Sequence, residues 1–315
     1  MRGKSAFEPA TLIQALQPYD PTAVCAASTI ADYYDFYELD FRAEIPGLTH
    51  SLGWITSGSH RLAVQSFIPP AARGTAVVCH GYYDHVGLYG HLLRFLLAEG
   101  LAVVTFDLPG HGLSSGARAN IASFSEYVSA LDDVVTVAVA EARLPHPWHI
   151  IGQSMGGAVV MEYLVRHTAD DFAKVVLLAP LIRPAAWSIN RIIYGLARRF
   201  VTERPRTITR NAENAEFLNL MACDPLAPQT LPMQWIAAMV SWMAQFEAYP
   251  VLPFAPLVVQ GHADRTVGWR HNLKILASKC TYDLLEIPLA RHHLVNESAE
   301  IRAEMFAWLA ERLRT

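Results

Sequence analysis

Short apolar runs alternate with longer amphipathic segments along most of the chain. The runs are rich in Val, Ile and Leu and end at Gly, Pro or Ser, which is typical of strands buried on both faces of a parallel sheet. The predicted core strands lie within residues 75–81, 101–110, 148–154, 174–180, 255–261 and 282–288. The predicted helices are residues 88–98, 124–142, 155–167, 269–278 and 301–313. This alternation predicts an α/β fold with a mostly parallel central sheet flanked by helices.

Two regions depart from this alternation. Residues 50–70 have the pattern of two strands around a Ser/Gly turn, so we expect an antiparallel edge on the parallel sheet. Residues 182–249 contain no strand-like run, only helical patterns and Pro-bearing segments, and we interpret them as a helical cap inserted into the core. The predicted division is an N-terminal extension at 1–45, a core at 46–181 and 250–315, and the cap between the two core parts.

The predicted cap contains two apolar stripes at helical spacing. The first stripe consists of Ile189, Ile192, Ile193, Leu196 and Phe200. The second consists of Trp235, Met239, Trp242 and Phe246. Either these stripes pack on the domain below, or part of their surface lines an apolar acyl pocket. For the second case, the candidate substrate-binding residues are Trp187, Trp235 and Trp242.

Composition and charge narrow the class of protein. With 52% hydrophobic and 17% charged residues, the 315-residue chain can bury a large core. A net charge of -4 offers no basic excess for a phosphate backbone, so we expect no nucleic-acid partner. We see no signal-peptide pattern and no apolar stretch of spanning length, and the four cysteines are widely separated. These features predict a cytoplasmic protein with reduced thiols.

The segment GQSMG places Ser154 between two glycines, where an apolar run meets a helical pattern. A short G-x-S-x-G string is weak evidence alone, but a strand–turn–helix context is what a nucleophile elbow requires. The glycines permit a tight backbone approach, and the helix start supplies N–H groups beside the serine oxygen. The alternative is a helix-capping serine, although capping does not require a glycine on each side.

A serine nucleophile needs a histidine base, and that histidine needs a carboxylate to orient it. Asp264 follows the predicted strand at 255–261, and His292 and His293 follow the last predicted strand. The order Ser, acid, His is the one found when a nucleophile elbow is present. The expected oxyanion hole consists of the backbone N–H groups of Met155 and Tyr82.

Four ordered motifs resemble the monoacylglycerol lipase and lysophospholipase branch of the α/β-hydrolase superfamily. They are residues 80–133, beginning HGYYDHVG, then GQSMGG, GHADRTV and LARHHLVNE. The resemblance implies an α/β-hydrolase fold with a cap, and it implies that His292 is the base. Three positions depart from the family's pattern: Asp84 replaces the usual Glu, Tyr82 fills a position that is often smaller, and His293 follows the base where a non-His residue is typical.

The resulting hypothesis is a cofactor-independent serine hydrolase that cleaves esters of a single acyl chain, a lysophospholipid or a monoacylglycerol. A small soluble ester or an amide stays open as the substrate. The cap is a candidate for peripheral membrane contact. Its arginines either meet an anionic head group or form a solvated basic face. These arginines are Arg191, Arg198, Arg199, Arg204 and Arg206.

Two other classes of protein are alternatives to a serine hydrolase. A metal-dependent hydrolase would use a cluster of His and Asp side chains, although the usual zinc spacings are absent. Its candidate ligands are His80, Asp84, His85, Asp107, His111, Asp264 and His292. We instead expect Asp107, His111 and Arg118 to organise loops and Asp224 to form a turn. A non-catalytic ligand-binding protein of the same fold is the second alternative, because fold alone does not establish catalysis.

Overall fold

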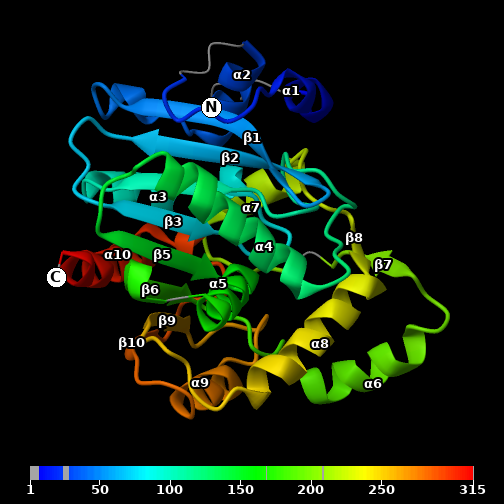
Figure 1. Ribbon diagram of the computed structural model, residues 1–315. Helices are drawn as coiled ribbons and strands as arrows, with labels where there is room; N and C mark the ends of the chain where they lie inside the picture. Colours follow the sequence, from blue (N-terminus) through cyan, green and yellow to red (C-terminus); the bar gives the residue numbers. More distant parts are fainter. Residues whose placement is uncertain (1–6, 24–27, 168, 208, 315) are drawn as a thin grey trace.

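The chain folds around one eight-stranded sheet (Figure 1). The computed structural model describes residues 7–23, 28–167, 169–207 and 209–314. The strand order is β1-β2-β4-β3-β5-β6-β9-β10. Their bounds are β1 Thr49–Ser57, β2 His60–Ile68, β3 Thr75–Cys79, β4 Ala102–Phe106, β5 Trp148–Gln153, β6 Phe172–Leu178, β9 Leu257–Gly261 and β10 Asp283–Ile287. Strands β1 and β2 form the predicted antiparallel edge, β2 also pairs antiparallel with β4, and the remaining pairs of this sheet are parallel. The predicted fold class is confirmed.

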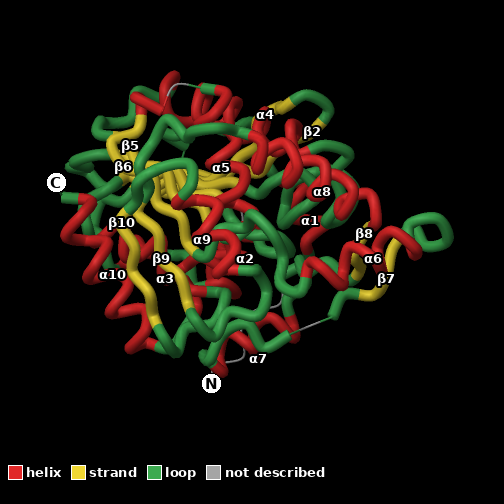
Figure 2. The backbone as a smooth tube through the Cα atoms, turned by 90° about the horizontal axis from the view of Figure 1, so that it is seen from below, coloured by secondary structure: helices red, strands yellow, loops and turns green. Residues whose placement is uncertain are grey.

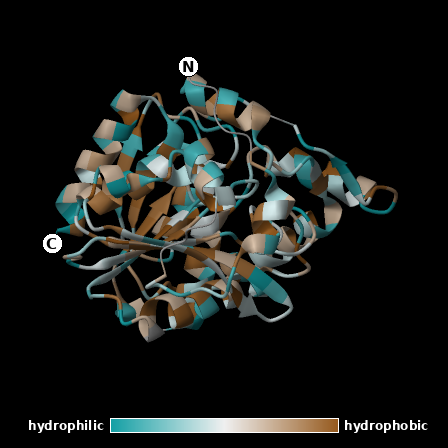
Figure 3. Cartoon of the chain, turned by 90° about the horizontal axis from the view of Figure 1, so that it is seen from above, coloured by the Kyte–Doolittle hydropathy of each residue, from teal (hydrophilic) through white to brown (hydrophobic). Residues whose placement is uncertain are grey.

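Helices cover both faces of the sheet (Figure 2). Their bounds are α1 Pro9–Ala15, α2 Ser28–Tyr37, α3 Gly90–Ala98, α4 Phe124–Val134, α5 Met155–Arg166, α6 Trp187–Ala197, α7 Ala215–Cys223, α8 Met233–Ala248, α9 Trp269–Ala277 and α10 Ala299–Leu313. Alternate residues of a strand enter different cores: Val77 belongs to the cluster that includes α4, α5, α8 and α9, and Val78 to the cluster that includes α1, α2, α3 and α10. The strands are therefore hydrophobic on both sides, as the colours of Figure 3 show.

The helix predicted over residues 124–142 changes its hydrogen bonding part of the way along. It begins with a capping box, in which Ser123 and Glu126 satisfy each other's backbone N–H groups. The α-helical part ends at Val134, and Val135–Glu141 continue as a π-helix. Periodicity cannot show such a change, because a single apolar stripe survives a small local change in helical pitch.

The region predicted as an all-helical cap also contains two short strands. Strand β7, Glu203–Pro205, pairs antiparallel with β8, Thr230–Pro232. The expectation that residues 182–249 contain no strand was therefore wrong, since three-residue strands are too short to show alternation. Helices α6 and α8 lie at the lower right of Figure 1 and on the same side of Figure 2. The domain boundaries themselves stay a prediction.

The two apolar stripes of this region have different surroundings. All four members of the α8 stripe are buried. Helix α6 contains no buried residue, and its stripe is open: Ile189 is 64% exposed, Ile192 61% and Leu196 69%. Of the two alternatives for these stripes, packing on the domain below holds for α8 and does not hold for α6.

The described part of residues 1–45 packs on the sheet through α1 and α2, at the top of Figure 1. The hydroxyl of Tyr37 in α2 donates to Asp224 Oδ1 at 2.6 Å, and His85 Nε2 lies 2.9 Å from Asp224 Oδ2. Asp224 also accepts from the Leu226 N–H, so it forms the predicted turn. This buried network joins the N-terminal segment, the loop after β3 and the end of α7.

Three of the four cysteines, Cys79, Cys223 and Cys280, are free thiols, and Cys25 lies outside the described residues. Within the described ranges, no helix is both long enough and apolar enough to cross a membrane.

Candidate active site

Ser154 occupies a strained turn between β5 and α5. Its φ of +54° lies in the region that residues with a Cβ rarely adopt. Its backbone is held on both sides, since its N–H donates to the Leu178 carbonyl and its own carbonyl accepts from the Leu181 N–H. The side chain makes no capping hydrogen bond with α5, so the helix-cap interpretation has no support in the geometry.

Glycine at position 156 allows this turn to lie close to β3. A Cβ there would stand 2.1 Å from the Cys79 carbonyl oxygen and 2.6 Å from that of His80. Contacts that short are forbidden to any side chain, so only glycine lets the first turn of α5 pack on the end of β3. The loop that follows β3 is thereby brought beside Ser154.

Ser154, His292 and Asp264 form one hydrogen-bonded chain. His292 Nε2 lies 2.8 Å from Ser154 Oγ, and His292 Nδ1 lies 2.7 Å from Asp264 Oδ2. Asp264 Oδ1 accepts from the N–H groups of Thr266 and Val267 at 2.7 and 3.1 Å. All three predicted side chains are buried, and they meet across 138 residues of sequence.

The electrostatics of the pair keep Asp264 charged and make His292 more basic. Burial alone would lower the pKa of His292, but the charge and hydrogen bond of Asp264 outweigh it and raise that pKa above its usual value. Burial alone would raise the pKa of Asp264, but the charge of His292 and the N–H donors of Thr266 and Val267 lower it. The pair is thus suited to accept the Ser154 proton.

The loop after β3 lies against Ser154 as an oxyanion hole requires. A Cβ on Gly81 would stand 3.3 Å from Ser154 Cβ. Met155 is the first residue of α5, where helical N–H groups have no partner within the helix. The Tyr82 ring stacks on Trp235 of α8, with centroids 3.6 Å apart and planes at 17°, and its hydroxyl donates to the Ala119 carbonyl. The large side chain of Tyr82 is therefore held by contacts with α8 and with the Ala119 carbonyl.

Asp84 and His293, two of the three departures from the family's pattern, contact each other. His293 Nε2 lies 3.2 Å from Asp84 Oδ2, and the Tyr89 hydroxyl donates to the same oxygen at 2.9 Å. Tyr89 in turn accepts the N–H of Gly81. Burial alone would raise the pKa of Asp84, but the adjacent His293 outweighs it, so that pKa is low. Sequence reasoning treated the two departures separately and missed this link between the His292 loop and the oxyanion loop.

The other His and Asp candidates hold loops in place. His80 Nε2 accepts from the Leu108 N–H, and Asp107 accepts from the N–H groups of Val86 and Leu113. Arg118 donates to the Gly112 carbonyl. Across the part of the chain that the structure describes, no group of three or more His, Cys, Asp or Glu side chains could hold a metal ion.

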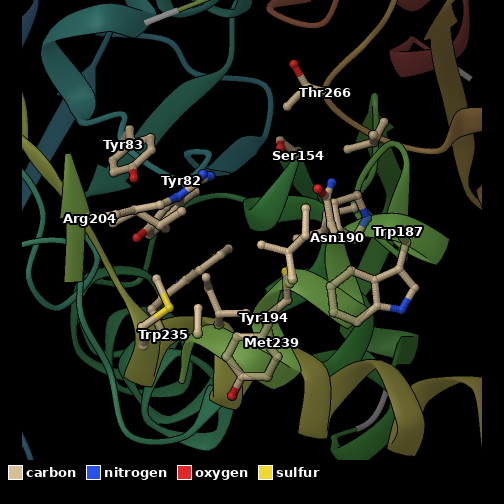
Figure 4. Close-up of a pocket in the computed structure, with 18 residues that line it drawn as sticks. Tyr82, Tyr83, Ser154, Trp187, Asn190, Tyr194, Arg204, Trp235, Met239 and Thr266 are labelled. Atoms are coloured by element: carbon tan, nitrogen blue, oxygen red, sulfur yellow. The ribbon is translucent and has the colours of Figure 1, made fainter. Parts of the chain in front are cut away.

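An apolar cavity of about 320 Å³ opens from Ser154 (Figure 4). Trp187 of α6 and Trp235 of α8 line it, as predicted, and Met239 of α8 lines it too. Tyr82, Tyr83 and Arg204 lie together at another side of the cavity in Figure 4. This cavity is bounded by the core on one side and by α6 and α8 on the other.

Trp242 does not line this cavity, so its predicted place in the acyl pocket was wrong. Its indole N–H donates to Glu162 of α5 at 3.0 Å, and its ring stacks on Phe124 of α4. Glu162 is fully buried and also receives Arg166 and the Tyr249 hydroxyl. Trp242 therefore anchors α8 to the core, which an apolar stripe alone cannot distinguish from lining a pocket.

Comparison with known proteins adds a family and a set of relatives. Residues 70–299 match the family described as serine aminopeptidase, S33. The monoacylglycerol lipase of Mycolicibacterium smegmatis is 27% identical over 254 residues, which cover 76% of this chain and 89% of that protein. Phospholipase YtpA of Bacillus subtilis is 25% identical over 201 residues, covering 61% of this chain and 76% of that one.

Solved structures agree on the fold. A soluble variant of the Saccharomyces cerevisiae monoglyceride lipase, in complex with a substrate analog, superposes with a TM-score of 0.73. The match covers 83% of this chain and 94% of that one at 16% identity, so it supports the architecture and not the substrate.

Proposed function

Because the chain belongs to the serine aminopeptidase S33 family and is an ester-hydrolysing α/β hydrolase of the monoglyceride lipase branch, we propose that Ser154, His292 and Asp264 are its catalytic triad. The observation that carries the proposal is the hydrogen-bonded chain from Ser154 Oγ through both nitrogens of His292 to Asp264. Such an arrangement is recognised by geometry and roles rather than by position in the sequence.

The reaction proceeds through an acyl-enzyme. Ser154 Oγ attacks the ester carbonyl carbon while His292 Nε2 takes its proton, and the N–H groups of Met155 and Tyr82 stabilise the oxyanion. When the tetrahedral intermediate collapses, the carbon–oxygen bond to the alcohol breaks, and the leaving oxygen takes the proton from His292. Water then attacks the acyl-enzyme with His292 again as base, which releases the fatty acid and restores Ser154.

The proposed substrate is an ester of a single acyl chain. The cavity beside Ser154 is lined mainly by apolar and aromatic side chains, among them Trp187, Ile193 and Met239. Burying a hydrocarbon chain there is favourable in proportion to the apolar area removed from water. A lysophospholipid and a monoacylglycerol both supply one such chain, and the relatives include one named a monoacylglycerol lipase and one named a phospholipase.

The open face of α6 supports peripheral membrane contact through the cap. Ile189, Ile192 and Leu196 are each more than half exposed, and Phe200 just beyond the helix is 88% exposed. An amphipathic helix that presents such a face lies well in a membrane interface. It would hold the cavity, which α6 lines with Trp187 and Ile193, close to the lipid.

The first experiment is labelling with a fluorophosphonate probe, followed by mapping of the modified peptide. We expect the label on Ser154 in the wild type and none in Ser154→Ala, whose turnover of a lipid ester should fall by several orders of magnitude. Ser278→Ala, which removes an exposed serine, is the matched control and should keep both properties. Esterase activity retained by Ser154→Ala, with the fold intact by circular dichroism, would falsify the triad.

A further inference from the structure

A second cavity, also of about 320 Å³, reaches the active site from another side. His292 lines it, whereas Ser154 lines the apolar cavity, and Thr266 lines both. Figure 4 shows Thr266 next to Ser154 at the edge of the apolar cavity. The two cavities therefore adjoin at the triad.

The second cavity has a different lining. Three arginines line it, Arg210, Arg265 and Arg291, with Thr209 and Asn211, and its described lining residues include no Asp or Glu. We call it the arginine pocket. The Asn211 carbonyl accepts the N–H of His293, so one wall of the pocket is bonded directly to the loop that carries His292.

The charges of the arginine pocket are only partly balanced. Glu213, which does not line the pocket, pairs with both Arg210 and Arg291. The buried Glu297 accepts from the backbone N–H groups of Arg291 and Glu213 rather than from a guanidinium. Arg265 has no ion pair or hydrogen bond of its guanidinium among the residues that the structure describes. Glu213 thus pairs with two of the three arginines, and the Arg265 side chain is left without an ion pair among the described residues.

The geometry of proton transfer from His292 places the leaving alcohol on the side of the arginine pocket. His292 must return its proton to the oxygen of the departing alcohol, so that oxygen lies on the His292 side of the scissile carbon. The acyl chain takes the apolar cavity at Ser154. The alcohol therefore extends toward the pocket that His292 and Thr266 line.

We infer that the arginine pocket binds the leaving alcohol and selects one that carries a phosphate monoester; this inference rests on the proposed function. Guanidinium groups match phosphate oxygens in a planar, bidentate geometry. The Arg265 side chain, with no carboxylate partner among the described residues, is free for that contact. The preferred substrate is then a lysophospholipid that ends in a phosphate, rather than an uncharged monoacylglycerol.

The test compares 1-acylglycerol 3-phosphate with 1-acylglycerol of the same acyl chain, both in micelles of one neutral detergent. For the wild type we expect kcat/KM to be at least roughly tenfold higher for the phosphate ester, because each hydrogen bond to a charged group contributes about that factor. The ratio of kcat/KM for the phosphate ester to kcat/KM for the uncharged ester should decrease as salt is added. In Arg265→Gln and Arg210→Gln, we expect the ratio to fall by roughly tenfold.

Arg204→Gln is the matched variant, because it removes the same charge from the apolar cavity. Its ratio should stay at the wild-type value. An equal fall in Arg204→Gln and Arg265→Gln would overturn the assignment, since the preference would then reflect net charge or the other cavity. A wild-type ratio near one would also overturn it.

A second measurement needs no variant. Glycerol 3-phosphate should protect Ser154 from the fluorophosphonate probe at a concentration at least roughly tenfold lower than glycerol does. Equal protection by the two would contradict the arginine pocket. If 1-acylglycerol is hydrolysed without any phosphate preference, only this inference fails. If neither ester is hydrolysed and Ser154 is not labelled, the proposed function itself fails.

Discussion

Helices α5 and α6 both carry many apolar residues, yet they differ completely in what those residues contact. Ten consecutive residues of α5, from Met155 to Leu164, are buried. Helix α6 has none: Ile189 and Ile192 are open to solvent, and Ile193 borders the cavity. Core side chains are packed so closely that even one added methyl group has no room, as at Gly156 against β3. The apolar side chains of α6 are largely exposed instead.

This difference separates two tasks. The proposed nucleophile, Ser154, lies in a buried, hydrogen-bonded position at the N-terminal end of α5. The proposed acyl chain, which has no polar group to be positioned, would contact the exposed helix α6 on one side and the anchored helix α8 on another. Substitutions in the core should therefore change the chemistry, and substitutions on α6 should change access to the substrate.

The largest expected effect is that of Asp264→Asn. The amide cannot compensate an imidazolium, and it favours the wrong tautomer of His292, so kcat should fall by roughly 10⁴-fold. The measurement is steady-state kinetics on a short soluble ester, with the melting temperature as a check on the fold. Asp170→Asn, at an exposed site, is the control. Wild-type kcat in Asp264→Asn would show that another group orients His292.

A methyl group added to each helix gives the second comparison. In Gly156→Ala the new Cβ meets two β3 carbonyl oxygens, so we expect a loss of about 1–3 kcal/mol in the free energy of unfolding and a displaced Ser154. In Gly195→Ala of α6 nothing lies within 4 Å, so we expect a gain of about 0.5–1 kcal/mol. Both are measured by denaturant unfolding. Equal effects at the two positions would contradict the distinction between the helices.

Substitution of the open α6 face should act on the interface rather than on the fold. In the triple variant Ile189→Ser, Ile192→Ser and Leu196→Ser, turnover on vesicles relative to a soluble ester should fall by roughly tenfold. The free energy of unfolding should change by less than about 0.5 kcal/mol per site. Leu289→Ser removes an exposed apolar side chain, 77% accessible, from another part of the surface and is the control. If turnover on vesicles relative to a soluble ester is unchanged, the proposed membrane contact of α6 is contradicted.

The smallest effect concerns pH. His292 acts as a base only when neutral, and its pKa is raised by Asp264 against the opposing effect of burial. The acid limb of kcat/KM should therefore lie above pH 6.5, the usual value for histidine, with activity increasing as pH rises through it. Trp187→Ala in α6 should alter KM and leave the limb in place. A limb below pH 6.5 would mean that the Asp264 contact does not dominate in solution.

Much of the core was predictable because its signals are local. The apolar runs gave every strand of the parallel sheet, and Ser154, Asp264 and His292 each follow such a run directly. Fold rules then bring the ends of parallel strands to one edge of the sheet. The hydrogen-bonded chain of these three residues agrees with that expectation.

The parts that escaped prediction depend on contacts between distant segments. Asp224 meets Tyr37 across 187 residues and His85 across 139, and no local pattern marks either contact. Trp242 belongs to the same stripe as Trp235, yet a buried carboxylate on α5 turns it away from the cavity. Strands β7 and β8 are stabilised by each other rather than by their own residues.

The stacking of Tyr82 on Trp235 couples two events that the sequence keeps apart. A displacement of α8 that separates these rings would remove one contact of the loop that carries the proposed oxyanion donor, the Tyr82 N–H. Linkage is reciprocal, so whatever holds α8 closed also orders that donor. The position of α8 is in this sense a support of the proposed oxyanion hole, although α8 contributes no group to the hydrogen-bonded chain of Ser154, His292 and Asp264.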